Sequence, residues 1–151
     1  MKRFCFAVLM AASAITLACA GAAAAAPLTV ITEGLRNGQG RVAVAVFASE
    51  QGFPKEEGKA VRRMFVPIQD PHSEVSLIIP DLPAGIYAVA VFHDNDESGK
   101  LETSFFGVPR KGYGFSNNLV PSMRSASFEE AAFNLPQSGT TVRVRLVYRG
   151  D

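Results

Sequence analysis

The chain has 151 residues, with 15 lysines and arginines against 14 aspartates and glutamates and a formal net charge of +1. A nucleic-acid-binding domain needs a concentrated basic surface, so this balance argues against a nucleic-acid partner. Both cysteines, Cys5 and Cys19, lie near the N-terminus. The rest of the chain therefore offers neither a disulfide framework nor a cysteine metal site.

The first 26 residues have the layout of a secretory signal peptide. Lys2 and Arg3 form a positive start, an apolar run follows, and small residues continue as far as Ala26. The apolar run is too short for a membrane anchor. We expect cleavage between Ala20 and Ala26, which leaves a single domain over residues 27–151. Removal of the signal takes away two of the 15 basic residues, so 13 remain against 14 acidic residues. Because of the signal, the mature protein is predicted to be periplasmic or secreted.

A lipid anchor at Cys19 is the alternative for this segment. The run Thr16-Leu17-Ala18-Cys19 has threonine at the position where a lipobox normally has leucine. We therefore expect an exported protein without a lipid anchor. No later apolar run reaches membrane-spanning length, so we expect no transmembrane segment in the mature chain.

Short strands separated by turn residues are predicted after the signal. Leu28–Glu33 alternates in side-chain character, and so does Arg41–Phe47, which is rich in valine. Period two with β-branched residues favours strands over helices. Between them, residues 34–40 contain Asn37-Gly38, which suits a tight reversal. We predict that the two strands pair as a hairpin.

Two further strands are predicted before the centre of the chain. Val61–Ile68 contains Pro67, which cannot donate to a β-ladder, so this strand should lie at a sheet edge. Asp70–Ser73 has the composition of a turn. A strand through Val75, Leu77 and Ile79 is expected to end in a second turn at Pro80–Gly85.

Ile86–His93 is predicted to be the central strand. Its two faces are both apolar, which indicates burial on both sides. Tyr87, Val89 and Val91 share one face with His93, while Ala88, Ala90 and Phe92 share the other. The small alanines leave room for a covering layer, and the long loop after this strand is expected to supply it.

The last two predicted strands complete an all-β chain. Phe128–Leu135 is a weak strand, whereas Thr141–Arg149 alternates clearly between inward apolar and outward polar residues. Seven short strands with turns between them fit an antiparallel β-sandwich of immunoglobulin-like or transthyretin-like type, with one long aromatic loop. A small barrel is the alternative.

The turn after the central strand carries oxygen-bearing side chains at alternate positions. Alternate residues of a tight loop point at one cation, and a glycine at the sixth position allows the sharp turn. Gly99 holds this position, whereas Phe105 occupies the twelfth, where a helical calcium hand has glutamate. A weak calcium site is therefore one interpretation, and a solvated acidic hairpin is the other. The expected calcium ligands are Asp94, Asp96, Ser98, Glu102 and the backbone carbonyl of Lys100.

The long loop that follows is rich in aromatic residues. A loop of this length in a small domain is usually functional or disordered, and four aromatics argue against disorder. It could line a pocket for a sugar or an apolar ligand, or its aromatics could pack over Ala88 and Ala90 as an Ω-loop. The candidate ligand-binding residues are Phe105, Phe106, Tyr113, Phe115, Asn117, Asn118 and His93.

His93 is also the one residue that suggests a general base. Its neighbour Asp94 points to the opposite side of the strand, so the two do not form a dyad. His93 follows the apolar phase of its strand, which favours a hydrogen-bonded histidine at the end of the core. His72 is distant in the sequence, and the two histidines give no zinc signature.

The run YAVAVFHDNDESGKLETSFFGVPRKGYGFSNN resembles the central signature of a bacterial exported family, domain of unknown function 2141. The similarity extends over nearly all of residues 28–148. It implies an exported β-sandwich and supplies no catalytic residue. Ser98 and Glu102 stand where members more often have asparagine and aspartate, and both substitutions keep an oxygen.

The sequence thus favours a non-enzymatic, exported binding module for a cell-envelope or extracellular ligand. The acidic turn and the aromatic loop are its expected interaction site. The alternatives are a cell-envelope hydrolase that uses His93 as its base, and a purely structural envelope protein.

Overall fold

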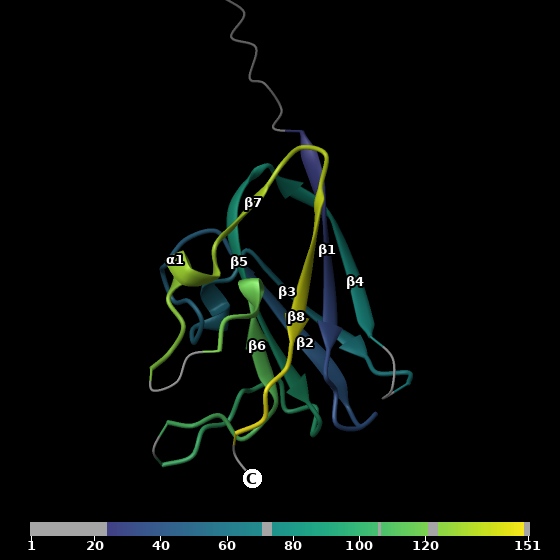
Figure 1. Ribbon diagram of the computed structural model, residues 1–151, viewed down its shortest axis with the longest axis vertical. Coiled ribbons are helices and arrows are strands. Elements are labelled where there is room, and N and C mark those ends of the chain that lie inside the picture. The colour runs from purple at the N-terminus through teal and green to yellow at the C-terminus, as the bar shows by residue number, and fades with distance from the viewer. Residues whose placement is uncertain (1–23, 71–73, 106, 121–123, 150–151) are drawn as a thin grey trace, which may run out of the picture.

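A computed structural model shows two β-sheets that pack face to face (Figure 1). One sheet has the order β4-β1-β8 and the other β3-β2-β5-β6, with β7 paired to β5. The predicted all-β sandwich is confirmed. The structure describes residues 24–70, 74–105, 107–120 and 124–149. Its elements are β1 (Ala25–Glu33), β2 (Arg41–Phe47), η1 (Glu57–Lys59), β3 (Arg62–Pro67), β4 (Val75–Pro83), β5 (Gly85–Asp94), β6 (Tyr113–Phe115), η2 (Ser116–Asn118), α1 (Phe128–Ala131), β7 (Phe133–Leu135) and β8 (Thr140–Arg145).

The first two predicted strands form, but the hairpin between them is wrong. β1 pairs antiparallel with β4 and parallel with β8, whereas β2 pairs with β3 and β5. Residues 34–40 therefore carry the chain from one sheet to the other, with positive φ at Gly34 and Gly40. Turn residues mark where a strand ends, but they do not specify which sheet the next strand joins.

Prolines in two edge strands bear on two of the sequence predictions, the edge position of one strand and the turn after another. β3 lies at the edge of its sheet, as Pro67 predicted. The turn predicted at Pro80–Gly85 is shorter than expected, because β4 continues to Pro83 and β5 begins at Gly85. β4 is also an edge strand, so Pro80 can be accommodated there, and a register shift in the pairing with β1 absorbs an extra residue. Most of the turn predicted at Asp70–Ser73 lies outside the described residues.

The strand predicted over Phe128–Leu135 is wrong in its first half. Phe128–Ala131 forms the single turn α1, and only Phe133–Leu135 is a strand. Ser127 Oγ accepts a hydrogen bond from the Glu130 backbone N–H, and the Glu130 carboxylate accepts one from the Ser127 N–H. This reciprocal capping box stabilises the start of a helix, and the sequence Ser-Phe-Glu-Glu carries its signature.

Strand β5 is buried on both faces, as predicted. Val89 and Val91 belong to the core between the two sheets. Ala88 and Phe92 face the other way and belong to a second apolar cluster on the outer side of the β3-β2-β5-β6 sheet. That cluster also contains Ala43, Tyr113, Phe115, Ala126 and Ala131. The outer face of this sheet is therefore covered by the chain after β5.

Strand β6 links the two sheets along one side. Tyr113 exchanges two backbone hydrogen bonds with Val147, just beyond the end of β8, with N···O distances of 3.0 and 2.8 Å. At Gly114, a Cβ would lie 2.7 Å from the carbonyl oxygen of Arg145. The missing side chain at Gly114 lets β6 approach β8 this closely.

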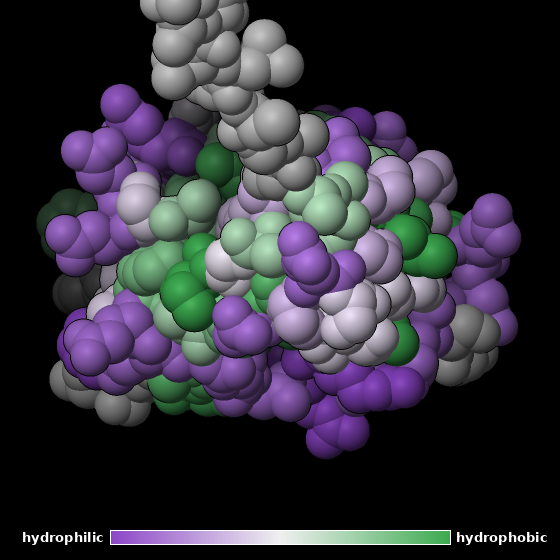
Figure 2. Space-filling view, turned by 90° about the horizontal axis from the view of Figure 1, so that it is seen from above, coloured by the Kyte–Doolittle hydropathy of each residue, from purple (hydrophilic) through white to green (hydrophobic). Residues whose placement is uncertain are grey.

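Within the described residues, no helix is long and apolar enough to cross a membrane. Figure 2 shows the end of the sandwich at which β1 begins, and hydrophobic groups there are interrupted by hydrophilic side chains. A groove lies instead along the outer face of β2 and β5.

Gly114→Ala should lower the free energy of unfolding by about 1–3 kcal/mol, because the new methyl group would overpack against β8. Gly58→Ala is the control, since a Cβ there meets nothing within 4 Å. Its effect should stay within about 0.5 kcal/mol. Urea denaturation measures both values, and equal effects would contradict the close approach of β6 and β8.

Candidate functional site

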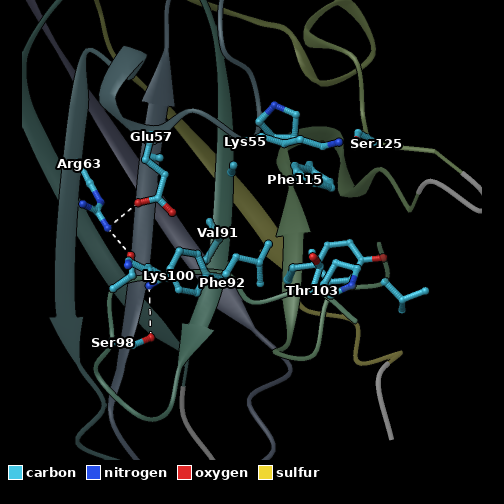
Figure 3. A pocket seen from close by; sticks show the side chains of 18 of the residues that line it. Lys55, Glu57, Arg63, Val91, Phe92, Ser98, Lys100, Thr103, Phe115 and Ser125 are labelled. Carbon is cyan, nitrogen blue, oxygen red and sulfur yellow. Dashed lines mark hydrogen bonds and ion pairs between the residues drawn. The ribbon is translucent and has the colours of Figure 1, made fainter. Parts of the chain in front are cut away.

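The outer face of β2 and β5 forms the floor of a groove with a volume of about 1230 Å³ (Figure 3). Ala45 and Ala90 lie opposite each other on the two strands, and their small side chains leave space above the sheet. Tyr113 and Phe115 line the groove from β6, and residues 98–101 together with Thr103 line it from the loop after β5. A concave, largely apolar hollow of this size can hold a small organic ligand.

The charged side chains around the groove are mostly basic. Glu57 is the only carboxylate among the lining residues that the structure describes. Arg63 forms an ion pair with it at 2.5 Å, and the same guanidinium donates to the Gly99 carbonyl. Burial raises the pKa of Glu57 above its ordinary value of 4.5, although Arg63 opposes the shift. The basic lining residues are Arg41, Lys55, Arg63, Lys100, Arg124 and Arg149.

Two of these arginines are held in place by an aromatic ring. The guanidinium carbons of Arg41 and Arg63 lie 3.9 and 4.8 Å from the ring centroid of Phe65. Cation–π contacts of this kind fix the orientation of a guanidinium without neutralising its charge. These two arginines, one from β2 and one from β3, are therefore preorganised, and each also pairs with a carboxylate, Arg41 with Asp94 and Arg63 with Glu57.

Only part of the predicted aromatic site lines the groove. Tyr113 and Phe115 do so, with 5% and 6% of their surface exposed, but they belong to a strand and not to a loop. Phe105 is 96% exposed and lies outside the groove lining. Phe106 lies outside the described residues.

The two asparagines that were predicted to bind a ligand hold the backbone instead. Asn117 Nδ2 donates to the carbonyls of Glu130 and Ala132 at 3.1 and 2.9 Å. Asn118 Oδ1 accepts from the Arg145 N–H at 2.9 Å. Both residues have positive φ, a conformation that asparagine tolerates better than most residues. They connect the turn after β6 to α1 and β8.

His93 is a hydrogen-bonded core histidine, as its position in the strand predicted. It is 2% exposed, and its Nε2 lies 2.8 Å from the Gln39 carbonyl. A carbonyl only accepts, so Nε2 carries the proton and Nδ1 accepts from the Tyr148 hydroxyl at 2.9 Å. Both ring nitrogens are thus engaged, and neither partner is a carboxylate. This arrangement leaves His93 no free nitrogen to act as a base.

The oxygens predicted to bind calcium surround the side-chain ammonium of Lys111. Lys111 Nζ lies 3.0 Å from Asp94 Oδ1 and 2.5 Å from Asp96 Oδ1. It lies 2.8 Å from Ser98 Oγ and 2.9 Å from the Lys100 carbonyl oxygen. Only 7% of Lys111 is exposed. These five residues are termed the lysine cage.

Asp94 connects the lysine cage to the sheet. Its side chain is fully buried, and its second oxygen accepts from Arg41 Nε and from the Gly99 N–H, each at 2.9 Å. Gly99 has the positive φ expected at the sixth loop position. Glu102 does not join the cage: it is exposed, and its backbone carbonyl accepts from the Arg110 N–H. Within the described residues, no group of three or more His, Cys, Asp or Glu side chains is arranged to hold a metal.

The ion pairs of the cage keep Lys111 and Asp96 charged. The hydrogen bond from Lys111 holds the pKa of Asp96 far below its ordinary value of 3.8. Burial by itself would lower the pKa of Lys111, but the hydrogen bonds to Asp96 and Asp94 outweigh burial and raise it. The ammonium and the Asp96 carboxylate therefore both remain ionised at neutral pH.

These features define a two-sheet all-β domain with a groove on the outside of one sheet and a lysine-filled acidic loop beside it. The chain belongs to a bacterial family described as "Uncharacterized protein conserved in bacteria (DUF2141)", which matches residues 30–143. The matched range contains the lysine cage and β6. Neither the comparison with curated proteins nor the comparison with solved structures gave a match.

Asp94→Asn should lower the free energy of unfolding by about 3–5 kcal/mol, because it leaves two cationic partners without their buried counter-ion. Glu102→Gln changes a carboxylate of the same loop outside the cage, and its effect should stay within about 0.5 kcal/mol. Urea denaturation compares the two variants. A small effect of Asp94→Asn would refute the structural role of the cage.

Proposed function

We propose that the chain is an exported binding module whose groove takes a small organic anion with an apolar part. The observation that carries this proposal is the combination of an alanine floor, an aromatic wall and a basic rim in one hollow. The ligand is expected to come from the cell envelope or the extracellular medium, because the first 26 residues have the pattern of a secretory signal.

The apolar part of the ligand would lie against β5 and β6. The small side chains of Ala45 and Ala90 leave space for it above the sheet. Beside them, Tyr113 and Phe115 form an aromatic wall with ring centroids 5.8 Å apart. Phe53 is not a lining residue but packs against Phe115, with ring centroids 5.9 Å apart. Little of Tyr113 or Phe115 is exposed, so the wall would act on an apolar group through close van der Waals contact.

The anionic part would meet cations that come from different segments. Lys55 and Lys100 lie on different sides of the groove in Figure 3, while Arg63 reaches in from β3 beside Glu57. In a partly enclosed space a carboxylate, sulfate or phosphate group gains more from such cations than it would in open water. The surplus of positive over negative side chains at the rim favours an anion over a cation.

The two alternatives have less support. A hydrolase needs a free base, and the only one that the sequence suggested, His93, is buried and fully hydrogen-bonded. A purely structural protein would need no hollow beside Tyr113 and Phe115, yet both residues line the groove. The geometry favours binding over both.

The start of β1 bears on the proposed export. Ala25 pairs with Pro83, and Ala26 pairs with Leu82 and is fully buried. Cleavage upstream of Ala25 would keep both contacts, whereas cleavage at Ala26 would remove the first ladder pair. Within the predicted range of cleavage positions, the structure therefore favours those before Ala25.

Ala90→Leu should weaken binding of the anionic dye 8-anilinonaphthalene-1-sulfonate at least tenfold, because the larger side chain fills the floor of the groove. Fluorescence titration of the dye gives the dissociation constants. Ile78→Ala is the control, since Ile78 is a 62% exposed apolar residue of the other sheet. Unchanged affinity in Ala90→Leu, or an equal loss in Ile78→Ala, would contradict binding in the groove.

Dye binding should also strengthen as the pH falls through the raised pKa of Glu57. Protonation there removes the one negative charge of the lining residues, whereas the sulfonate of the dye stays ionised. Glu57→Gln should bind the dye more tightly at neutral pH and lose this pH dependence. Parallel pH profiles for the wild type and Glu57→Gln would show that the dye does not bind beside Glu57.

A further inference from the structure

We propose that Lys111 is a built-in cation that takes the place of a metal ion in a calcium-type loop. On this account the loop becomes a divalent-cation site when the Lys111 side chain is shortened. In the natural chain, the ammonium occupies the site and makes the loop independent of metal.

The first argument is the identity of the four oxygens. A calcium loop supplies side-chain oxygens from its first, third and fifth positions and a backbone carbonyl from its seventh. Asp94, Asp96 and Ser98 fill the first three places, and the Lys100 carbonyl fills the fourth. All four point at one atom, Lys111 Nζ. The chain thus forms the ligand arrangement of a metal site around an ammonium.

The second argument is the number of oxygens around that atom. An ammonium has three protons, yet four oxygens lie within 3.0 Å of Lys111 Nζ. This exceeds one acceptor for each proton and resembles a coordination shell. Two of the oxygens come from carboxylates, one from a hydroxyl and one from a backbone carbonyl, all of which are oxygen ligands that calcium accepts.

The third argument is size. Calcium–oxygen distances are about 2.3–2.6 Å, whereas the oxygens lie 2.5–3.0 Å from Lys111 Nζ. Without the ammonium, a shift of a few tenths of an ångström would bring these oxygens to calcium. The twelfth position, Phe105, offers no carboxylate, so the variant site should be weaker than a helical calcium hand.

The position of Lys111 explains why the natural chain should not need the metal. The next residue, Gly112, accepts a backbone hydrogen bond from the His93 N–H at 2.8 Å, which fixes the base of the Lys111 side chain beside β5. A group tethered so closely has an effective concentration in the millimolar range or above. The ammonium also keeps four oxygen contacts, so free calcium at up to 10 mM should fail to displace it.

The test compares thermal unfolding of the full wild-type chain and of Lys111→Ala, each in 10 mM calcium chloride and in EDTA. We expect calcium to raise the melting temperature of Lys111→Ala by several degrees and to leave the wild type unchanged. Lys111→Ala with Asp96→Asn should lose the response. Two controls complete the set: Lys111→Met fills the cage with an uncharged chain and should not respond, and Lys100→Ala keeps its backbone carbonyl and should behave like the wild type.

Three results would overturn the proposal. They are an equal calcium response in the wild type, no response in a folded Lys111→Ala, and failure of Lys111→Ala to fold even in 10 mM calcium. A second measurement needs only the wild type: the ¹⁵N resonance of the Lys111 ammonium should stay unchanged in 10 mM calcium. A shift of this resonance on addition of calcium would also overturn the proposal.

Discussion

The structure depends on one buried ionic contact, between Asp94 at the end of β5 and Lys111 on the returning loop. Removing two charges from water costs several kilocalories per mole for each ion unless further hydrogen bonds compensate. Here Asp94 is also bound by Arg41 and by the Gly99 N–H, and Lys111 has three more oxygens around it. Strand β2, strand β5 and the loop are therefore joined at a single point.

The groove is a consequence of that contact. Ser98, Gly99 and Lys100 belong to the loop that closes around Lys111, and the same three residues form part of the groove wall. Arg41 bonds Asp94 on one side and lies over Phe65 on the other, so the lysine cage also places part of the basic rim. The same loop thus contributes residues to both the proposed ligand site and the lysine cage.

Much of this arrangement could be predicted from local sequence. Alternation of apolar residues identified β2 and the two buried faces of β5, and the spacing of Asp94, Asp96 and Ser98 identified oxygens that converge on one cation. The nature of the cation could not be predicted, because Lys111 is separated from Asp94 by a loop whose path depends on tertiary packing. The prediction that β1 and β2 pair as a hairpin was wrong for a similar reason, since distant strands decide which sheet each strand joins. In contrast, the capping box at Ser127 was readable and would have corrected the strand predicted there.

The central claim is that the lysine cage holds the groove wall in place. Hydrogen-exchange mass spectrometry of the wild type and of Lys111→Met tests it most directly, because local opening is measured segment by segment. The account predicts faster exchange over residues 95–112 in Lys111→Met, with β1 and β4 unchanged. Identical exchange over residues 95–112 in the two proteins would contradict it.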